Sequence, residues 1–210
     1  MLTIENFSKA YSGTTIISIA SLKLSSGIYW IKGENGSGKT TFFKSLAGLH
    51  PCEGKIQFDD GVNLHTNPIP FRKRVNYSEA EPLYPGFLTS KDLIRFIGKT
   101  KGADQKQQDF FVEQFKMSSY FEKPCETYSS GMLKKLSLAI AFLGAPKLII
   151  LDEPLITLDI QARSVLIQII EKYIHEHEVT FLLSSHQALE SDDLKVNDTF
   201  VIEKKTLVQG

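Results

Sequence analysis

The spacing of apolar residues changes along the chain, and each change marks a different kind of secondary structure. In the first third, residues 2–7, 14–20 and 28–33 are rich in β-branched and aromatic side chains between turn signals, which predicts strands. Residues 54–61 have the same composition and run into an Asp-Gly turn. A helix is predicted over about residues 39–49. Strand, glycine-rich loop and helix in this order indicate the start of an α/β unit.

From about residue 89 to residue 145 the pattern is helical throughout, and we interpret this stretch as a helical insertion. The last third alternates again. It predicts a buried strand over 147–151, a helix over 160–177, a strand over 179–185 and a strand or hairpin over 199–209. In the long helix, apolar residues recur every three or four positions, which is typical of a helix packed on a sheet.

The segment Gly33–Thr40, GENGSGKT, matches the phosphate-loop pattern of a glycine, four residues, Gly-Lys and Ser or Thr. Glycines let the backbone turn its N–H groups inward around phosphates, Lys39 adds a positive charge, and Thr40 offers a hydroxyl to Mg²⁺. The context agrees, because a predicted strand ends at Lys32 and a predicted helix begins at Lys39. We therefore predict a nucleotide site. The expected contacts from this segment are Gly33, Asn35, Gly36, Ser37, Gly38, Lys39, Thr40 and Thr41.

Two further strands end in polar side chains that fit the same site. The apolar strand in KLIILDEP, Lys147–Pro154, ends in Asp152 and Glu153. Parallel strands bring their carboxyl ends to one edge of a sheet, so Asp152 is expected to hold Mg²⁺ through water and Glu153 to act on an attacking water. A helix cap or a solvated turn is the alternative for this pair. The strand in LLSSH ends in His186, a third catalytic candidate at the same edge.

A second turn with phosphate-binding character lies at Tyr128–Lys135, YSSGMLKK. Two serines and a glycine lead directly into a helix, whose apolar positions follow at helical spacing. A helix start carries unsatisfied N–H donors and about half a positive charge, so it attracts an anion. Taken alone, the pattern leaves open which anion this turn holds. Lys134 and Lys135 are expected to lie on a solvated helix face.

Composition narrows the function classes. The chain of 210 residues has 24 Lys and Arg against 24 Asp and Glu, so no basic surplus points to direct nucleic-acid binding. No apolar run approaches the roughly 18 residues that cross a bilayer, and the first residues lack the pattern of a signal peptide, so work at a membrane would need another chain. Cys52 and Cys125 lie far apart and are expected to be reduced thiols in the cytosol. Four histidines are expected to be solvated: His50, His65, His175 and His177.

The order of these motifs resembles the nucleotide-binding subunit of ABC transporters over essentially the whole chain. In that family the turn at Tyr128–Met132 corresponds to the signature motif, usually Leu-Ser-Gly-Gly-Gln, of which the serine and the second glycine are present here. The resemblance implies that this turn binds the ATP that the phosphate loop of a second copy holds, through Ser129, Ser130 and Gly131.

The same resemblance implies roles for single residues elsewhere. Tyr11 would stack on adenine, Asp159 would be the acid of the loop that crosses the dimer, and His186 would touch the γ-phosphate. It also implies the fold class: an α/β protein with a P-loop NTPase core, an N-terminal antiparallel β subdomain and an α-helical insertion that carries the signature. In this single domain, residues 1–88 and 146–210 would form the core and residues 89–145 the helical subdomain.

The resemblance also implies cofactors and partners. The cofactors would be ATP and Mg²⁺. The partners would be a second copy, or a paralogous ATPase subunit, and an integral membrane permease that docks on the helical insertion. The chain would then be cytoplasmic and peripheral on the inner face of the cell membrane.

One departure from the family pattern concerns a glutamine after the strand near VNYSEAEPLYP, which senses Mg²⁺ and water in the family. The aligned position falls near Ala80, with Glu79 and Glu81 on either side, so either glutamate is expected to take the role. Met132 replaces the usual glutamine of the signature. The missing glutamine after the strand, the compact length and the lack of a regulatory C-terminal domain favour export over import.

Two other functions share parts of this pattern. A soluble ABC-type ATPase acting on DNA or the ribosome would need a long heptad insertion or two cassettes in one chain, and the sequence has one cassette and no such insertion. A small-molecule kinase shares the phosphate loop but needs an arginine-bearing lid and an acceptor pocket, and the Asp-Glu pair with the signature turn fits hydrolysis better. The soluble ATPase is the main alternative.

Overall fold

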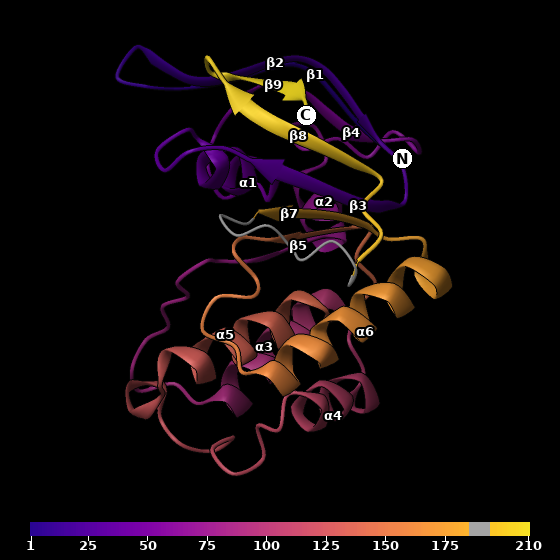
Figure 1. The fold of residues 1–210 in the computed structure, drawn as a ribbon. Helices are drawn as coiled ribbons and strands as arrows, with labels where there is room; N and C mark the ends of the chain where they lie inside the picture. Colours follow the sequence, from indigo (N-terminus) through magenta and orange to yellow (C-terminus); the bar gives the residue numbers. More distant parts are fainter. Residues whose placement is uncertain (185–193) are drawn as a thin grey trace.

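The computed structural model describes residues 1–184 and 194–210 and contains two sheets with helices packed against them (Figure 1). The smaller sheet is antiparallel and has the strand order β2–β1–β4. Its strands are β1 (Leu2–Tyr11), β2 (Thr14–Leu24) and β4 (Glu53–Phe58). This sheet contains three of the four strands predicted for the first third of the chain.

The larger sheet has six strands in the order β5–β6–β7–β3–β8–β9. All neighbouring pairs are parallel except β8–β9, which form the predicted C-terminal hairpin. The strands are β3 (Gly27–Lys32), β5 (Val75–Ser78), β6 (Leu148–Leu151), β7 (Thr180–Ser184), β8 (Asp198–Glu203) and β9 (Thr206–Gln209). The carboxyl ends of β3, β5, β6 and β7 therefore lie along one edge.

Side chains on the two faces of this sheet enter two different apolar cores, as the alternation of a strand requires. One face packs against α1 and the antiparallel sheet, and it carries Leu148, Ile150 and Leu182. The opposite face packs against the helices drawn below it in Figure 1, and it carries Ile149, Leu151 and Phe181. The polar groups that follow the strand ends are thus held between two packed layers.

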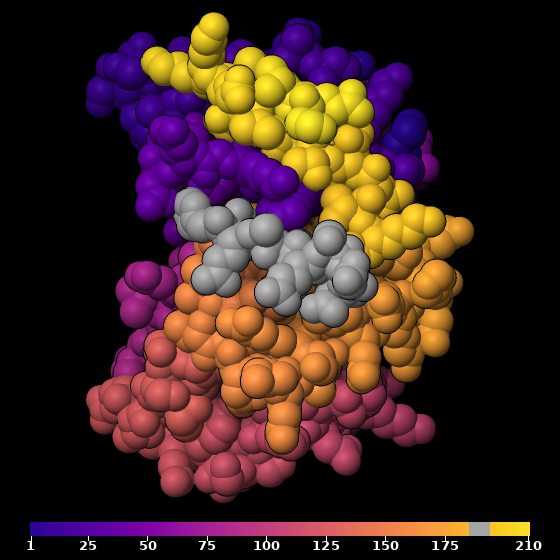
Figure 2. Space-filling view, viewed as in Figure 1, coloured from indigo at the N-terminus to yellow at the C-terminus, as the bar shows by residue number. Residues whose placement is uncertain are grey.

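The helices are α1 (Lys39–Leu46), α2 (Pro68–Arg74), α3 (Ser90–Lys101), α4 (Gln105–Gln114), α5 (Ser130–Ala141) and α6 (Ile160–His177). Helix α6 has the predicted bounds, and α1 is three residues shorter than the predicted span 39–49. Helix α2 was not predicted, because it is short and buries only Phe71. Figure 2 shows the antiparallel sheet and the β8–β9 hairpin at one end of the molecule and helical surface at the other.

The prediction of helix throughout 89–145 is wrong for residues 115–129, which contain only a short 3₁₀ turn at Cys125–Thr127. Helix α4 ends where Lys116 adopts a left-handed φ of 52°. Pro124 then lacks the N–H that a helix would need. The predicted division into a core and a helical subdomain stays a prediction. In the described parts of the chain, no helix is both long enough and apolar enough to cross a membrane.

Candidate functional site

The phosphate loop lies where the sequence predicts it, between the end of β3 at Lys32 and the start of α1 at Lys39. The N-cap of α1 is Gly38, whose φ of 107° favours glycine over any residue with a Cβ. Within residues 1–184 and 194–210, no side chain caps this helix. Its first N–H groups are therefore not satisfied by a capping side chain, and an anion can accept their hydrogen bonds.

Lys39 is 7% exposed, and its ammonium group lies over the same loop. Its Nζ donates to the carbonyl oxygens of Gly33 at 2.7 Å and Glu34 at 3.0 Å. Burial lowers the pKa of Lys39, while the carboxylates of Glu153 and Asp152 act in the opposite direction. A cation held by neutral carbonyls beside a backbone anion site can bind a phosphate oxygen.

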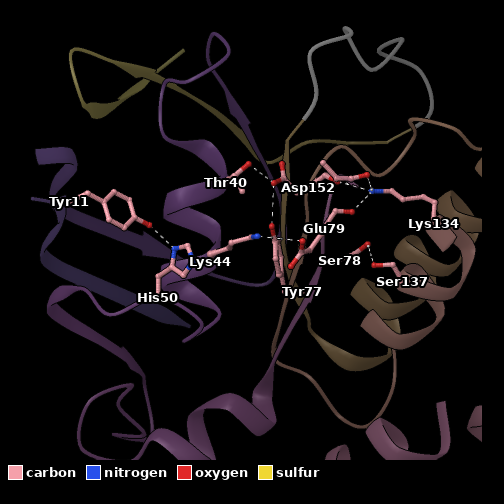
Figure 3. A network of polar contacts seen from close by, with 11 residues as sticks. Tyr11, Thr40, Lys44, His50, Tyr77, Ser78, Glu79, Lys134, Ser137 and Asp152 are labelled. Carbon is pink, nitrogen blue, oxygen red and sulfur yellow. Dashed lines mark hydrogen bonds and ion pairs between the residues drawn. The ribbon is translucent and has the colours of Figure 1, made fainter. Parts of the chain in front are cut away.

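Asp152 follows β6 and joins three segments of the site (Figure 3). It is 1% exposed. Its Oδ2 accepts from Thr40 Oγ1 at 2.7 Å and from the Tyr77 hydroxyl at 3.3 Å. Its Oδ1 accepts from Ser184 Oγ at 2.5 Å. The ends of β5, β6 and β7 are therefore tied to α1 through one carboxylate.

Tyr77 and Ser184 were not predicted as site residues, although Ser184 lies near the end of a predicted strand and Tyr77 near the end of β5. Ser184 is fully buried and also accepts a hydrogen bond from the backbone N–H of Glu153 at 3.0 Å. Burial raises the pKa of Tyr77 above its usual range, so its hydroxyl is a lasting donor to Asp152. These two residues fix the Asp152 carboxylate at the sheet edge, and Ser184 also fixes the backbone of Glu153.

Glu153 lies beside Asp152 and is 6% exposed. Its φ of 47° is uncommon for a residue with a side chain, a conformation that costs free energy and is concentrated at functional sites. The structure thus places both predicted carboxylates next to the phosphate loop. The third catalytic candidate, His186, lies outside the described residues.

Thr40 and Asp152 fit the donors that Mg²⁺ prefers. Their side-chain oxygens are 2.7 Å apart, and a hydroxyl with a single carboxylate, completed by phosphate oxygens and water, is how proteins usually bind this ion beside a nucleotide. No group of three or more His, Cys, Asp and Glu side chains that could hold a metal exists within the described ranges. The chemistry of the pair therefore suits Mg²⁺ bound together with phosphate.

The signature turn has a different character, because its polar groups face outward. Ser129 and Ser130 are exposed, and Ser129 is the N-cap of α5, with its Oγ accepting from the N–H of Met132 at 3.3 Å. Gly131 packs against the backbone, since a Cβ there would lie 2.9 Å from the carbonyl oxygen of Thr157. Only glycine permits this approach.

Asp159 lies close to this turn in the same chain. It is the N-cap of α6, where its Oδ1 accepts from the N–H of Ala162 at 2.8 Å. Its Oδ2 pairs with Lys135 Nζ at 2.6 Å. The hydrogen bond from Lys135 lowers the pKa of Asp159, so the carboxylate stays charged. Residues 129–135 and 157–159 therefore form one connected surface.

The two lysines of the signature segment correct the expectation of a solvated helix face. Lys134 is fully buried, and Lys135 is mostly buried in its ion pair. Burial lowers the pKa of Lys134 to about 8, against the opposing effect of nearby carboxylates. The spacing could have revealed this, because Lys134 shares a helix face with Ser137, Leu138 and Ala141, which are all buried.

Tyr11 is 43% exposed at the end of β1. Its hydroxyl hydrogen-bonds with His50 Nδ1 at 2.8 Å, and Lys9 Nζ lies 4.3 Å from its ring centroid. The expectation that His50 is simply solvated is therefore wrong. The stacking of Tyr11 on adenine stays a prediction.

Among the contacts of the described residues, Glu79 is the one of the two glutamates flanking Ala80 that is tied to the phosphate-loop helix. Its Oε2 lies 3.4 Å from Lys44 Nζ of α1, whereas Glu81 is exposed. Figure 3 shows Glu79 between Lys44 and Lys134.

Comparisons with known proteins agree with this geometry. A family model described as "ABC transporter" matches residues 18–156. The lantibiotic transport ATP-binding protein SrtF of Streptococcus pyogenes is 30% identical over 211 residues, which is 100% of this chain and 90% of the relative.

Solved structures share the fold at lower identity. The structure titled "Structure of ATP binding subunit of ABC transporter" aligns with a TM-score of 0.88 at 21% identity, covering 100% of this chain and 89% of that one. The dimeric post-hydrolysis state of the ATP-binding cassette MJ0796 with ADP and Pi aligns with a TM-score of 0.84 at 16% identity, covering 100% and 98%. The chain belongs to the ABC transporter family and is one of its ATP-binding, ATP-hydrolysing subunits.

Proposed function

We propose that two copies of this chain close head to tail around two ATP molecules and drive export through a separate membrane permease. The observation that carries the proposal is the contrast between its two anion-binding elements. Asp152 and Glu153 are buried beside the phosphate loop, whereas Ser129 and Ser130 are exposed at the start of α5. An exposed helix N-terminus next to an exposed acid suits a site that a second copy completes.

In this proposal each side chain has a defined task. The N–H groups after Gly33 and the ammonium of Lys39 bind the β- and γ-phosphates. Glu153 orients the attacking water and accepts its proton, and His186 contacts the γ-phosphate. Thr40 and Asp152 hold Mg²⁺, which neutralises phosphate charge when bound.

The second copy supplies the remaining contacts. Ser129, Ser130 and Gly131 would donate to the γ-phosphate held by the partner, with Asp159 beside them. A charge-assisted hydrogen bond contributes about 1.5–3 kcal/mol, so several of them can favour the closed dimer while ATP is intact. Hydrolysis removes this bridge and reopens the dimer, which is a ligand-driven shift between two states.

The proposed permease site is the groove of about 450 Å³ formed by β5, the segment after it, α3 and α5. Leu83 lines the groove and is 88% exposed, and Phe87 and Phe96 are 78% and 70% exposed nearby in the sequence. Apolar side chains left in solvent on this scale are typical of an interaction surface. Glu79 lines the same groove and pairs with Lys44, so it is our choice for the role of the missing glutamine.

Docking there would keep the chain on the cytoplasmic face of the membrane. The relative SrtF is named for lantibiotic transport. Export is our proposal for this chain because the family glutamine is missing.

The test is Glu153→Gln, which removes the proposed base and keeps its shape. Hydrolysis should fall about 10²- to 10⁴-fold, while ATP converts the monomer to a dimer on size exclusion. Glu113→Gln, an exposed glutamate on α4, is the matched control and should behave like the unsubstituted chain. A Glu153→Gln chain that stays monomeric at saturating ATP and Mg²⁺ would contradict the proposed dimer.

A further inference from the structure

Lys134 is a charged side chain with an exposed fraction of 0%, one turn into the helix that the signature begins. A buried charge costs free energy unless it is fully hydrogen-bonded. An apolar residue at this helix position would pack without that cost. The contacts of the ammonium group therefore explain what the lysine does.

The three donors of the ammonium group match three backbone acceptors. Nζ lies 2.7 Å from the carbonyl oxygen of Glu79, 3.3 Å from that of Ala80 and 2.8 Å from that of Asp152. Strand β5 ends at Ser78 and β6 ends at Leu151, so these carbonyls lie just beyond the last residues of the two strands. Carbonyls in such positions need another donor, and Lys134 provides it.

The same two segments reach the phosphate-loop helix through their side chains. Asp152 accepts from Thr40 at 2.7 Å, and Glu79 pairs with Lys44 at 3.4 Å. Figure 3 shows this chain of contacts from α1 through Asp152 and Glu79 to Lys134 on α5. Lys134 thus links the helix that begins at the signature to the residues proposed to hold the nucleotide of the same chain, and the Ser78–Ser137 hydrogen bond joins the same helix to the end of β5.

We propose that Lys134 is a positioning residue for ATP hydrolysis that couples the two half-sites of one chain. Its ammonium group fixes the signature helix to the backbone of Asp152 and of Glu79–Ala80. Nucleotide bound at the phosphate loop then orders the signature that serves the partner's nucleotide, and the reverse holds because coupling is reciprocal. This inference rests on the proposed head-to-tail dimer.

The experiment compares four forms of the full chain. Lys134→Met keeps the length of the side chain but loses the charge and all donors, whereas Lys134→Arg keeps a positive charge and hydrogen-bond donors. Lys172→Met, a half-exposed lysine on α6, is the control. For each form we would measure ATP affinity of the monomer with a fluorescent ATP analogue, hydrolysis against ATP concentration, and melting temperature.

We expect Lys134→Met to change the ATP affinity of the monomer less than about threefold while lowering kcat at least about tenfold. The reason is that the lost hydrogen bonds position the assembled dimer site and do not contact the ATP that the monomer binds. The Hill coefficient for ATP should fall from near ~2 towards ~1 as the half-sites uncouple. Lys134→Arg should recover most of the lost cooperativity, since it keeps donors for the carbonyls. Lys172→Met should match the unsubstituted chain.

A purely structural role gives a different result. If Lys134→Met lowers kcat only in proportion to its unfolded fraction and keeps the Hill coefficient, the inference is wrong. Should that variant fail to fold, Lys134→Gln replaces it, which loses the charge and one of the three donors; a kcat and a Hill coefficient equal to those of the unsubstituted chain would then contradict the inference. The proposed function is checked separately, because an unsubstituted chain with no ATP-dependent dimer and no cooperativity would overturn the dimer and this inference with it.

Discussion

The phosphate-loop half and the signature half of this molecule are both proposed to bind phosphate, yet they differ in how far their described residues are already assembled within one chain. Lys39, Asp152 and Glu153 are 7%, 1% and 6% exposed. Asp152 and Glu153 lie in a hydrogen-bond network with Thr40 and Ser184, and Lys39 donates to carbonyl oxygens of the phosphate loop. The signature half presents exposed serines at a helix start. The described contacts of Ser129, Gly131 and Lys135 lead to the signature helix itself and to residues 157–159.

This difference indicates how hydrolysis can be kept dependent on assembly. A preorganised, buried site holds its groups in place at no further cost when the substrate arrives. The exposed turn gains its full set of interactions only when phosphate is brought to it. The first half should therefore govern nucleotide affinity, and the second should govern closure and turnover.

Ser129→Arg tests this division with the largest expected effect. The bulky cation occupies the space for the partner's γ-phosphate contacts, so loss of two charge-assisted hydrogen bonds should weaken ATP-dependent dimerisation at least about 100-fold. ATP binding to the monomer should stay unchanged. Ser21→Arg, on the exposed part of β2, is the matched control, and size exclusion in the Glu153→Gln background is the measurement. A mutant that still dimerises would refute the role of the signature across the dimer.

Lys39→Ala should act on the phosphate-loop half. Removing the ammonium group should weaken ATP binding by the monomer about 10- to 100-fold, because a charged hydrogen bond to phosphate contributes roughly 1.5–3 kcal/mol. Equilibrium binding of a fluorescent ATP analogue measures it, with the exposed Lys55→Ala as control. Unchanged affinity would remove Lys39 from the nucleotide site.

Tyr11 provides a smaller and more specific test. Tyr11→Ala should weaken ATP binding about fivefold or more if the ring stacks on adenine, since stacking of a base on an aromatic side chain contributes about 1–3 kcal/mol. Tyr11→Phe keeps the ring and loses only the hydrogen bond to His50, so affinity should change less than about twofold. Equal losses in both variants would assign the effect to the hydroxyl instead of the ring.

Lys135→Met should have the smallest effect of these substitutions, and the effect should be on the free energy of unfolding. The ion pair with Asp159 is partly exposed, so unfolding free energy should fall by less than about 1 kcal/mol in urea titrations. Folding lowers the pKa of Asp159 below its ordinary value of 3.8. The contribution of the ion pair to the free energy of unfolding is therefore present above pH 3.8 and is lost as the pH falls through the pKa of Asp159 in the folded protein. The difference between the two proteins should therefore be seen near pH 7 and vanish in acid.

Much of the site could be predicted because its chemistry is contiguous in the chain. The phosphate loop is a single run from Gly33 to Thr40 between a strand and a helix, and Asp152 and Glu153 follow an apolar strand directly. Local patterns of this kind fix backbone conformation and side-chain type together. The bounds of α6 were predicted for the same reason.

The wrong expectations for side chains of the site have a different cause, since these contacts join residues far apart in sequence. Lys134 was expected in solvent because lysine usually lies there, and its burial follows from acceptors at Glu79, Ala80 and Asp152. His50 was expected to be solvated, and its side chain is hydrogen-bonded to Tyr11. Helical spacing could have indicated that Lys134 is buried, but no spacing rule connects Lys134 to its acceptors or His50 to Tyr11.

By itself, the sequence determined which elements form and which residues have the chemistry for phosphate and Mg²⁺, because propensity, periodicity and short motifs act over a few residues. Tertiary structure alone decided how those elements are joined. It brought Ser184 and Tyr77 to the Asp152 carboxylate and Lys44 to Glu79, and it brought Lys134 to the carbonyl oxygens of Glu79, Ala80 and Asp152. The physical reason is that a buried polar group must find its partner wherever the fold brings one within hydrogen-bonding distance.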